Sequence, residues 1–209
     1  MNVALVGHPL PSEEDALHRL KPLLPVSRLA HCQRVADMAE RIARAQGADL
    51  PKARMAGLVH DAAKALSPDE AQRLGIAIPD AVNALYEDYP ATWHAFAAPA
   101  VLSSQFEITD PDILSACEWH TTGKADMSLL EKVVYVADYC EVGRSFPQRG
   151  AIETLALTQL DQAVFAVSWC VLKELANRVV RIHPSSLACY NFYLALSGND
   201  GKMIAQNLP

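Results

Sequence analysis

Hydrophobic periodicity constrains the fold of this 209-residue chain more than any other feature of its sequence. Apolar residues recur three and four positions apart in segment after segment, and strict alternation with polar residues is almost absent. In the segment 26–45, for example, Leu29, Val35, Met38 and Ile42 fall on one side of a helix. The pattern predicts an all-α protein.

Helix start and stop signals divide this pattern into separate elements. Ser12 precedes three acidic residues, Pro51 suits a helix start, Ser67 precedes a proline and two acids, and Gly47 ends the helix that begins at Val26. The predicted helices are a short one from Ser12, then 26–45, 53–65, one from Ser67, 92–106, 111–120, 128–140, 151–182 and 184–196, with a turn-rich break at 143–150. No repeat or long linker divides them, so we expect one domain.

Charge and composition exclude several classes of protein. The net charge is −6, with 18 basic and 24 acidic residues, and no run of Lys or Arg occurs. A nucleic-acid partner is therefore not expected, whereas a small anion can bind where metal ions supply local positive charge. The five cysteines are scattered and never spaced C-x-x-C, which predicts reduced thiols.

Neither a signal peptide nor a membrane span is expected. Residues 1–11 lack the positively charged segment of a signal peptide. The most apolar run, 163–172, has about half the length that spans a bilayer. We expect a cytoplasmic protein without a membrane partner.

Six residues with metal-ligating side chains form the ordered series H…HD…H…H…D, with each member or pair on a separate predicted helix. In His60-Asp61, a carboxylate that can bridge two ions stands beside an imidazole that binds one. A lone charge would be costly to bury in the apolar segment 56–64, and a bound metal removes that cost. The series predicts a metal site formed by His31, His60, Asp61, His94, His120 and Asp138.

Cationic residues accompany the series. Lys64 is expected to share a helix face with His60 and Asp61, where its ammonium group can reach a metal-bound phosphate. Arg28 lies one turn before His31. Gly57 would let another helix approach closely. The remaining histidines, His8, His18 and His183, are expected to be surface or core residues without a metal.

The series resembles the signature of HD-domain metal-dependent phosphohydrolases, in which two extra histidines mark the two-metal branch. Further segments make the resemblance more specific. They are A-G-L-V-H-D-A-A-K at 56–64, H-T-T-G at 120–123, Y-V-A-D at 135–138, Glu141 and R-S-F-P at 144–147. From about residue 28 to about residue 148 the chain resembles the YqeK-type symmetrical bis(5′-nucleosyl)-tetraphosphatases. It departs from that pattern at Val142, where proline is usual, and at Glu118-Trp119, where small aliphatic residues are usual.

The resemblance implies an HD core over about 26–148 and further C-terminal helices over about 151–197. It assigns His31, His60, Asp61 and Asp138 to one ion and Asp61, His94 and His120 to the other. It favours iron, divalent or trivalent, with manganese or zinc as alternatives.

The implied reaction is attack of a metal-bridging hydroxide on an inner phosphorus of diadenosine tetraphosphate, giving two ADP. Asp61, Lys64, Arg28 and Arg144 would be catalytic. Arg28, Lys64, Thr121, Gly123 and Arg144 would contact the substrate.

Three alternatives stay open at this stage. They are another HD-domain nucleotide phosphohydrolase such as a nucleotidase, an oxygen-activating two-iron enzyme like inositol oxygenase, and a non-catalytic nucleotide-binding module. The segment 144–147 is specific to the tetraphosphatase pattern and so argues against the oxygenase. Non-catalytic HD domains typically lose ligands, so the complete series argues against the binding module. The C-terminal helices could serve the core or a homodimer contact.

Overall fold

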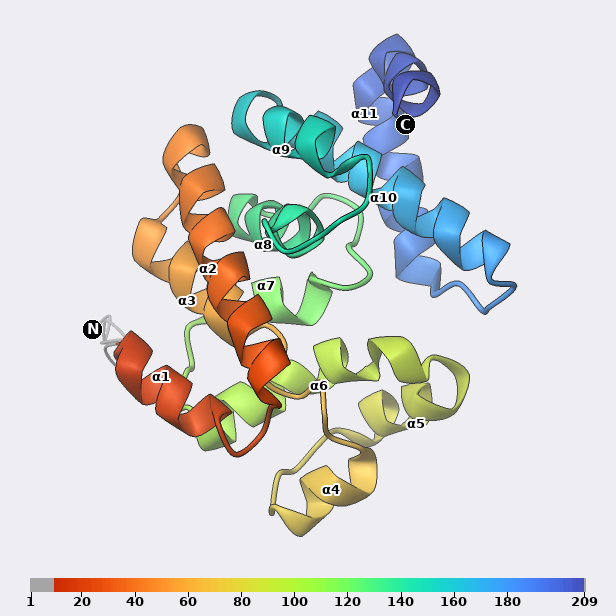
Figure 1. Cartoon of the computed structure of the whole chain (residues 1–209). Coiled ribbons are helices and arrows are strands. Elements are labelled where there is room, and N and C mark those ends of the chain that lie inside the picture. Colours follow the sequence, from red (N-terminus) through yellow and green to blue (C-terminus); the bar gives the residue numbers. More distant parts are fainter. Residues whose placement is uncertain (1–9, 209) are drawn as a thin grey trace, which may run out of the picture.

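The computed structural model describes residues 10–208, which form helices and no strand (Figure 1). The all-α prediction is confirmed. The signal-peptide prediction falls largely on residues 1–9, outside the described residues. In this part of the chain the helices are α1 (Glu13–Leu20), α2 (Val26–Gln46), α3 (Leu50–Val59), α4 (Pro68–Arg73), α5 (Asp80–Asp88), α6 (Pro90–Gln105), α7 (Pro111–Trp119), α8 (Leu129–Cys140), α9 (Arg149–Thr158), α10 (Leu160–Asn177) and α11 (Pro184–Asn207).

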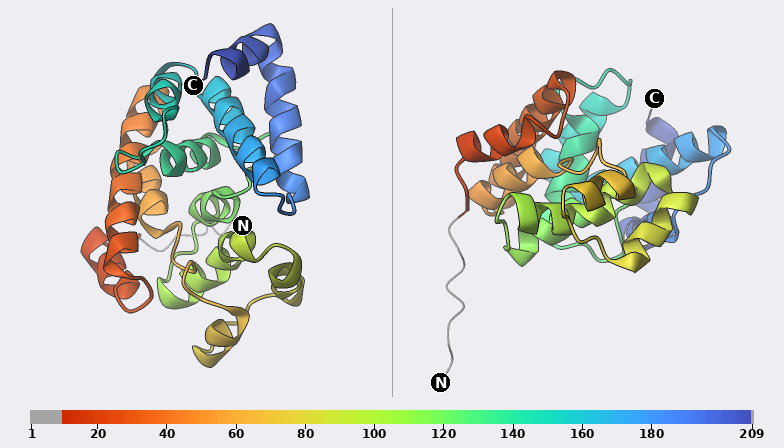
Figure 2. Two further views of the ribbon diagram at one scale, coloured as in Figure 1. Left: turned by 45° about the vertical axis from the view of Figure 1, so that its right-hand side comes forward. Right: turned by 90° about the horizontal axis from the view of Figure 1, so that it is seen from below.

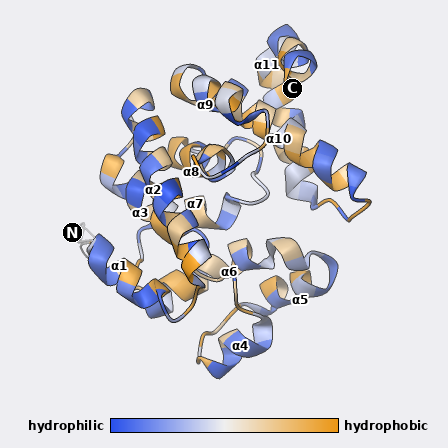
Figure 3. Cartoon of the chain, viewed as in Figure 1, coloured by the Kyte–Doolittle hydropathy of each residue, from blue (hydrophilic) through white to orange (hydrophobic). Residues whose placement is uncertain are grey.

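Helix α8 lies in the middle of the molecule and contacts α2, α3, α7, α9 and α10 (Figures 1 and 2). Its residues Val133, Val134, Val136 and Ala137 are completely buried. Hydropathy follows this arrangement, because α8 is largely hydrophobic in colour whereas much of α1 and α4 is hydrophilic (Figure 3). A helix with apolar residues on most of its surface is expected at the centre of a bundle.

Helices α2 and α3 pack closely because of Gly57. A Cβ atom at this position would lie 2.9 Å from the Cα atom of Ala36, so only glycine permits the observed separation. The expected close approach is therefore confirmed. It brings the C-terminal end of α3 against the middle of α2.

The C-terminal helices α10 and α11 lie side by side, and α10 also packs on α8 and α9 (Figures 1 and 2). His183 is the N-cap residue of α11, where its side chain accepts a hydrogen bond from the backbone N–H of Ser185. No described helix is long and apolar enough to cross a membrane.

Several helix boundaries differ from the predictions. Helix α3 ends at Val59, not at 65, because the next residues form turns with i to i−3 hydrogen bonds such as Lys64 N–H to Asp61 C=O. The segment 151–182, predicted as one long or bent helix, is two helices separated by the non-helical residue Gln159. The last helix continues to Asn207 through a non-helical Gly198, and α5 was not predicted.

Candidate metal centre

The structure brings all six residues of the H…HD…H…H…D series into one buried cluster. His31 comes from the first half of α2, and His60 and Asp61 directly follow α3. The other three come from α6, the residue after α7, and the C-terminal turn of α8; they are His94, His120 and Asp138. Five of the six are buried, and Asp138 has 22% of its side chain exposed. The cluster thus opens to solvent beside α8.

Asp61 lies at the centre of the cluster, and its two carboxylate oxygens face different histidines. Oδ1 lies 3.2 Å from His94 Nε2 and 3.5 Å from His120 Nε2. Oδ2 lies 3.5 Å from His60 Nε2 and 3.9 Å from His31 Nε2. A carboxylate with this placement can ligate one ion with each oxygen.

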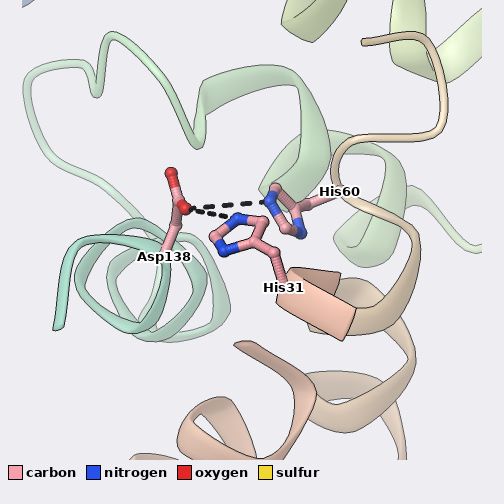
Figure 4. A group of neighbouring side chains, drawn as sticks. All are labelled: His31, His60 and Asp138. Carbon is pink, nitrogen blue, oxygen red and sulfur yellow. Dashed lines mark ion pairs between the residues drawn. The ribbon is translucent and has the colours of Figure 1, made fainter. Parts of the chain in front are cut away.

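A second carboxylate, that of Asp138 on α8, faces His31 and His60 (Figure 4). Asp138 Oδ1 lies 3.0 Å from His31 Nε2 and 3.8 Å from His60 Nε2. Two sets of three residues each bring their potential ligand atoms within 4.8 Å of one another. The first set is His31, His60 and Asp138, and the second is His60, Asp61 and His120.

The tautomers of the histidines show that these residues fit a metal. His60 Nδ1 lies 2.8 Å from the carbonyl oxygen of Gly57, and His120 Nδ1 lies 2.6 Å from that of Cys117. Since a carbonyl only accepts, each Nδ1 donates and each Nε2 directs a lone pair into the cluster.

The lone pairs of two histidines have no hydrogen-bond partner. His31 Nε2 and His60 Nε2 are buried without one, although carboxylate oxygens lie nearby. Lone pairs that face carboxylates in a buried site repel each other unless a cation lies between them. Burial also lowers the pKa of His94 to about 4, which keeps this imidazole neutral and able to ligate at neutral pH.

Glu141 holds His31 in position, a role that the sequence analysis did not assign. Its buried Oε1 lies 3.1 Å from His31 Nδ1, and its Oε2 accepts from Arg34 Nε at 2.6 Å. The carboxylate therefore turns His31 Nε2 toward Asp138. The available signal was a second acidic residue three positions after Asp138, at the end of an apolar helix.

Three cationic side chains, each about one-third exposed, lie at the mouth of the cluster. Arg28 Nη1 lies 3.0 Å from Asp61 Oδ2, and Arg144 Nη2 lies 2.7 Å from Asp138 Oδ1. Lys64 Nζ lies 3.1 Å from His94 Nε2 and 4.0 Å from Asp61 Oδ1. Lys64 reaches the site from a turn, so the expected shared helix face is wrong although the proximity is observed.

Thr121 and Gly123 have different environments. Thr121 Oγ1 lies 2.9 Å from His120 Nε2, at the edge of the cluster. Gly123 has a φ of 60°, and a Cβ atom there would lie 2.6 Å from Cys189 Sγ. The positive φ and the packing against Cys189 both favour glycine at position 123, and a substrate contact there stays a prediction.

The remaining histidines and the cysteines are not members of the His/Asp cluster. His18 is exposed, and the His183 ring packs on Tyr89 and Phe96. His8 is outside the described residues. All five cysteines are free, and burial together with the negative charge of Asp61 raises the pKa of Cys32 and Cys117. Both therefore stay protonated thiols, which are poor metal ligands.

Comparison with known proteins assigns this arrangement to a class. Residues 28–143 match the family model described as HD domain, so the chain belongs to the HD-domain family. A crystal structure of a predicted HD superfamily hydrolase involved in NAD metabolism, from Clostridium acetobutylicum, matches with a TM-score of 0.79 and 30% sequence identity. That match covers 90% of this chain and all of the other.

Two relatives narrow the class. The chain is 34% identical to the symmetrical bis(5′-nucleosyl)-tetraphosphatase of Bacillus subtilis, over 88% of this chain and 98% of the relative. It is also 34% identical to the protein of the same name from Halalkalibacterium halodurans, over 84% of this chain and 94% of that one. Within the HD-domain family, the chain belongs to the family of these tetraphosphatases.

Proposed function

We propose that the chain is a metal-dependent phosphoanhydride hydrolase that cleaves dinucleoside tetraphosphates symmetrically, giving two ADP from diadenosine tetraphosphate. One observation carries the proposal. Four imidazoles and two carboxylates from five parts of the chain converge in one cluster, and three cationic side chains surround its mouth. The relatives named above are symmetrical tetraphosphatases, which supports the same reaction here.

The ligand assignment belongs to the proposal. His31, His60, Asp61 and Asp138 would hold one ion, and Asp61, His94 and His120 the other. Iron is the proposed metal, and manganese and zinc suit the same mixture of imidazole and carboxylate ligands. When bound, such ions supply Lewis acidity toward the phosphate and lower the pKa of a water molecule.

The chain's own cations have a separate task, which is to bind and orient the polyphosphate. The guanidinium groups of Arg28 and Arg144 offer paired N–H donors to phosphate oxygens, while Lys64 offers a compact charge. All three already contact groups of the cluster, so a phosphate bound to them lies beside the ligand carboxylates. No nucleophilic side chain is required.

Product analysis tests the proposed bond cleavage. Diadenosine tetraphosphate should give ADP alone, and hydrolysis in ¹⁸O-labelled water should place label in one of the two ADP molecules, because one phosphorus is attacked and the other departs. Metal content is measured on the same sample. ATP plus AMP as products would contradict symmetrical cleavage, and free phosphate from a mononucleotide would indicate a nucleotidase.

A further inference from the structure

An open cavity of about 350 Å³ lies between the C-terminal turn of α8, which also carries Asp138, the segment that follows α8 and the second half of α10. Residues that line it include Tyr139, Phe146, Gln148, Cys170, Lys173 and Asn177. We propose that this cavity binds one nucleoside of the dinucleotide, with the base against Tyr139 and Phe146. The inference rests on the proposed function and identifies a substrate subsite for it.

The chain connects the cavity directly to the proposed phosphate-binding residues. Tyr139 follows Asp138 in α8, and Phe146 lies two residues after Arg144. The guanidinium group of Arg144 contacts Asp138 Oδ1 at 2.7 Å and lies close enough for its charge to act on the Tyr139 phenol. A polyphosphate held by Arg144 therefore has its nucleoside end within reach of the cavity.

Two aromatic rings form the apolar wall of the cavity. The ring centroids of Tyr139 and Phe146 lie 4.4 Å apart with an angle of 46° between the rings, and both side chains are half-buried. The Cys170 side chain lines the same cavity as the Tyr139 phenol. Partly exposed aromatic faces are what a base stacks on.

Polar side chains complete the lining. Gln148 and Asn177 bring amide groups, and Lys173 and Glu174 bring a donor and an acceptor. Amides both donate and accept, as the edge of a base does. The volume falls in the range of small-molecule sites, and it suits one nucleoside better than two. The second nucleoside must then bind elsewhere.

The binding of ADP and of tripolyphosphate to the metal-loaded protein, measured by isothermal titration calorimetry, tests the subsite. Phe146→Ala should raise the Kd of ADP about five- to hundredfold, because stacking on the ring is lost. Phe146→Leu keeps more of the packing and should show the same effect in smaller size. Both variants should bind tripolyphosphate, which has no base, like the wild type.

Phe192→Ala is the matched control, since Phe192 is a half-buried ring of α11 that packs on Tyr193, and it should leave both affinities unchanged. An unchanged Kd of ADP in both Phe146 variants would overturn the subsite, as would equal weakening of both ligands. If the wild type does not hydrolyse diadenosine tetraphosphate but ADP binding depends on Phe146, the proposed function fails and the subsite stands.

Discussion

The orientation of His31 depends on a single acidic residue, Glu141, which accepts a hydrogen bond from His31 Nδ1. Partners of this kind typically contribute ten- to hundredfold to metal affinity. We expect Glu141→Ala to weaken metal binding by about that factor, and Glu141→Gln to weaken it less because the amide oxygen still accepts. Competition with a chelator of known affinity measures the effect.

The control for this experiment is Glu153→Ala. Glu153 also pairs with two arginines, Arg41 and Arg149, but it lies on α9 outside the ligand cluster. Its loss should leave metal affinity unchanged. If the two alanine variants bind metal equally well, Glu141 does not position a ligand.

Lys64, Arg28 and Arg144, the three cationic residues at the mouth of the His/Asp cluster, should contribute to catalysis but not to metal binding. Lys64→Ala, Arg28→Ala and Arg144→Ala should each lower kcat/KM for diadenosine tetraphosphate about ten- to hundredfold, because each removes a charge-assisted contact to phosphate. Lys52→Ala, which removes a cation paired with Asp110 and Asp112, should have no effect. Normal kinetics in all three variants would show that the substrate binds elsewhere.

Among the elements, α2 and α3 depend most on a single position, Gly57. Gly57→Ala would force the Cβ atom against the backbone of Ala36, and we expect the free energy of unfolding to fall by about 1–3 kcal/mol. Gly150→Ala is the matched control, because its added Cβ atom would have no other atom within 4 Å and its φ is not positive. Urea denaturation of both variants measures the difference, and equal stability would refute the packing argument.

Helix α8 begins with a capping box that makes its stability depend on pH. Burial opposes the charged form of Glu131, but hydrogen bonds from Ser115, Lys124 and the Ser128 backbone N–H outweigh it and hold the pKa below the ordinary 4.5. The folded protein therefore favours the carboxylate, so this stabilisation is present above pH 4.5 and is lost as the pH falls through the lowered value.

Glu131→Gln should accordingly reduce the free energy of unfolding by about 2 kcal/mol at neutral pH and have a smaller effect near pH 3.5. Denaturation at both pH values tests this expectation. Glu87→Gln, at an exposed position of α5, is the control. An equal loss at both pH values would mean that the charge of Glu131 does not matter.

The same elements show how far the sequence predicts the structure. Capping residues correctly located the starts of α1 and α4, because a cap is a local interaction within three or four residues. The break at Gln159 was missed, because apolar residues continue on both sides of it and periodicity carries no sign of a change in direction. Helix α5 was missed because it begins after Pro79 without a side-chain cap, so the sequence carries no local start signal for it.

The predictability of the site has the same physical basis. The six residues of the H…HD…H…H…D series could be named from the sequence because histidine and aspartate are unusual in apolar helices. Their partners could not, since the contact between Glu141 and His31 joins positions 110 residues apart and depends on how α2 packs against α8. The cavity at Tyr139 and Phe146 likewise needs α10, which the sequence analysis could not place against α8.

In the molecule as a whole, the proposed metal ligands join α2, α3, α6, α7 and α8, which pack on one another. Ions bound there link five parts of the chain, and a ligand that binds only the folded state stabilises it. The helices also share a continuous apolar core that does not involve the site. The metal should therefore add stability to a protein that folds without it.

The final prediction follows from this separation of core and site. Removing metal with a chelator should lower the free energy of unfolding by about 2.7 kcal/mol or more when the ion had been present at a hundredfold its Kd. Asp61→Asn should abolish most of this metal-dependent difference, because Asp61 contacts both groups of histidines, while the circular dichroism spectrum stays helical. Asp161→Asn, which removes a partly exposed partner of Lys132, should keep the full difference. Equal stability of the wild type with and without metal would contradict the ligand assignment, and unfolding of the metal-free protein would show that the core depends on the site.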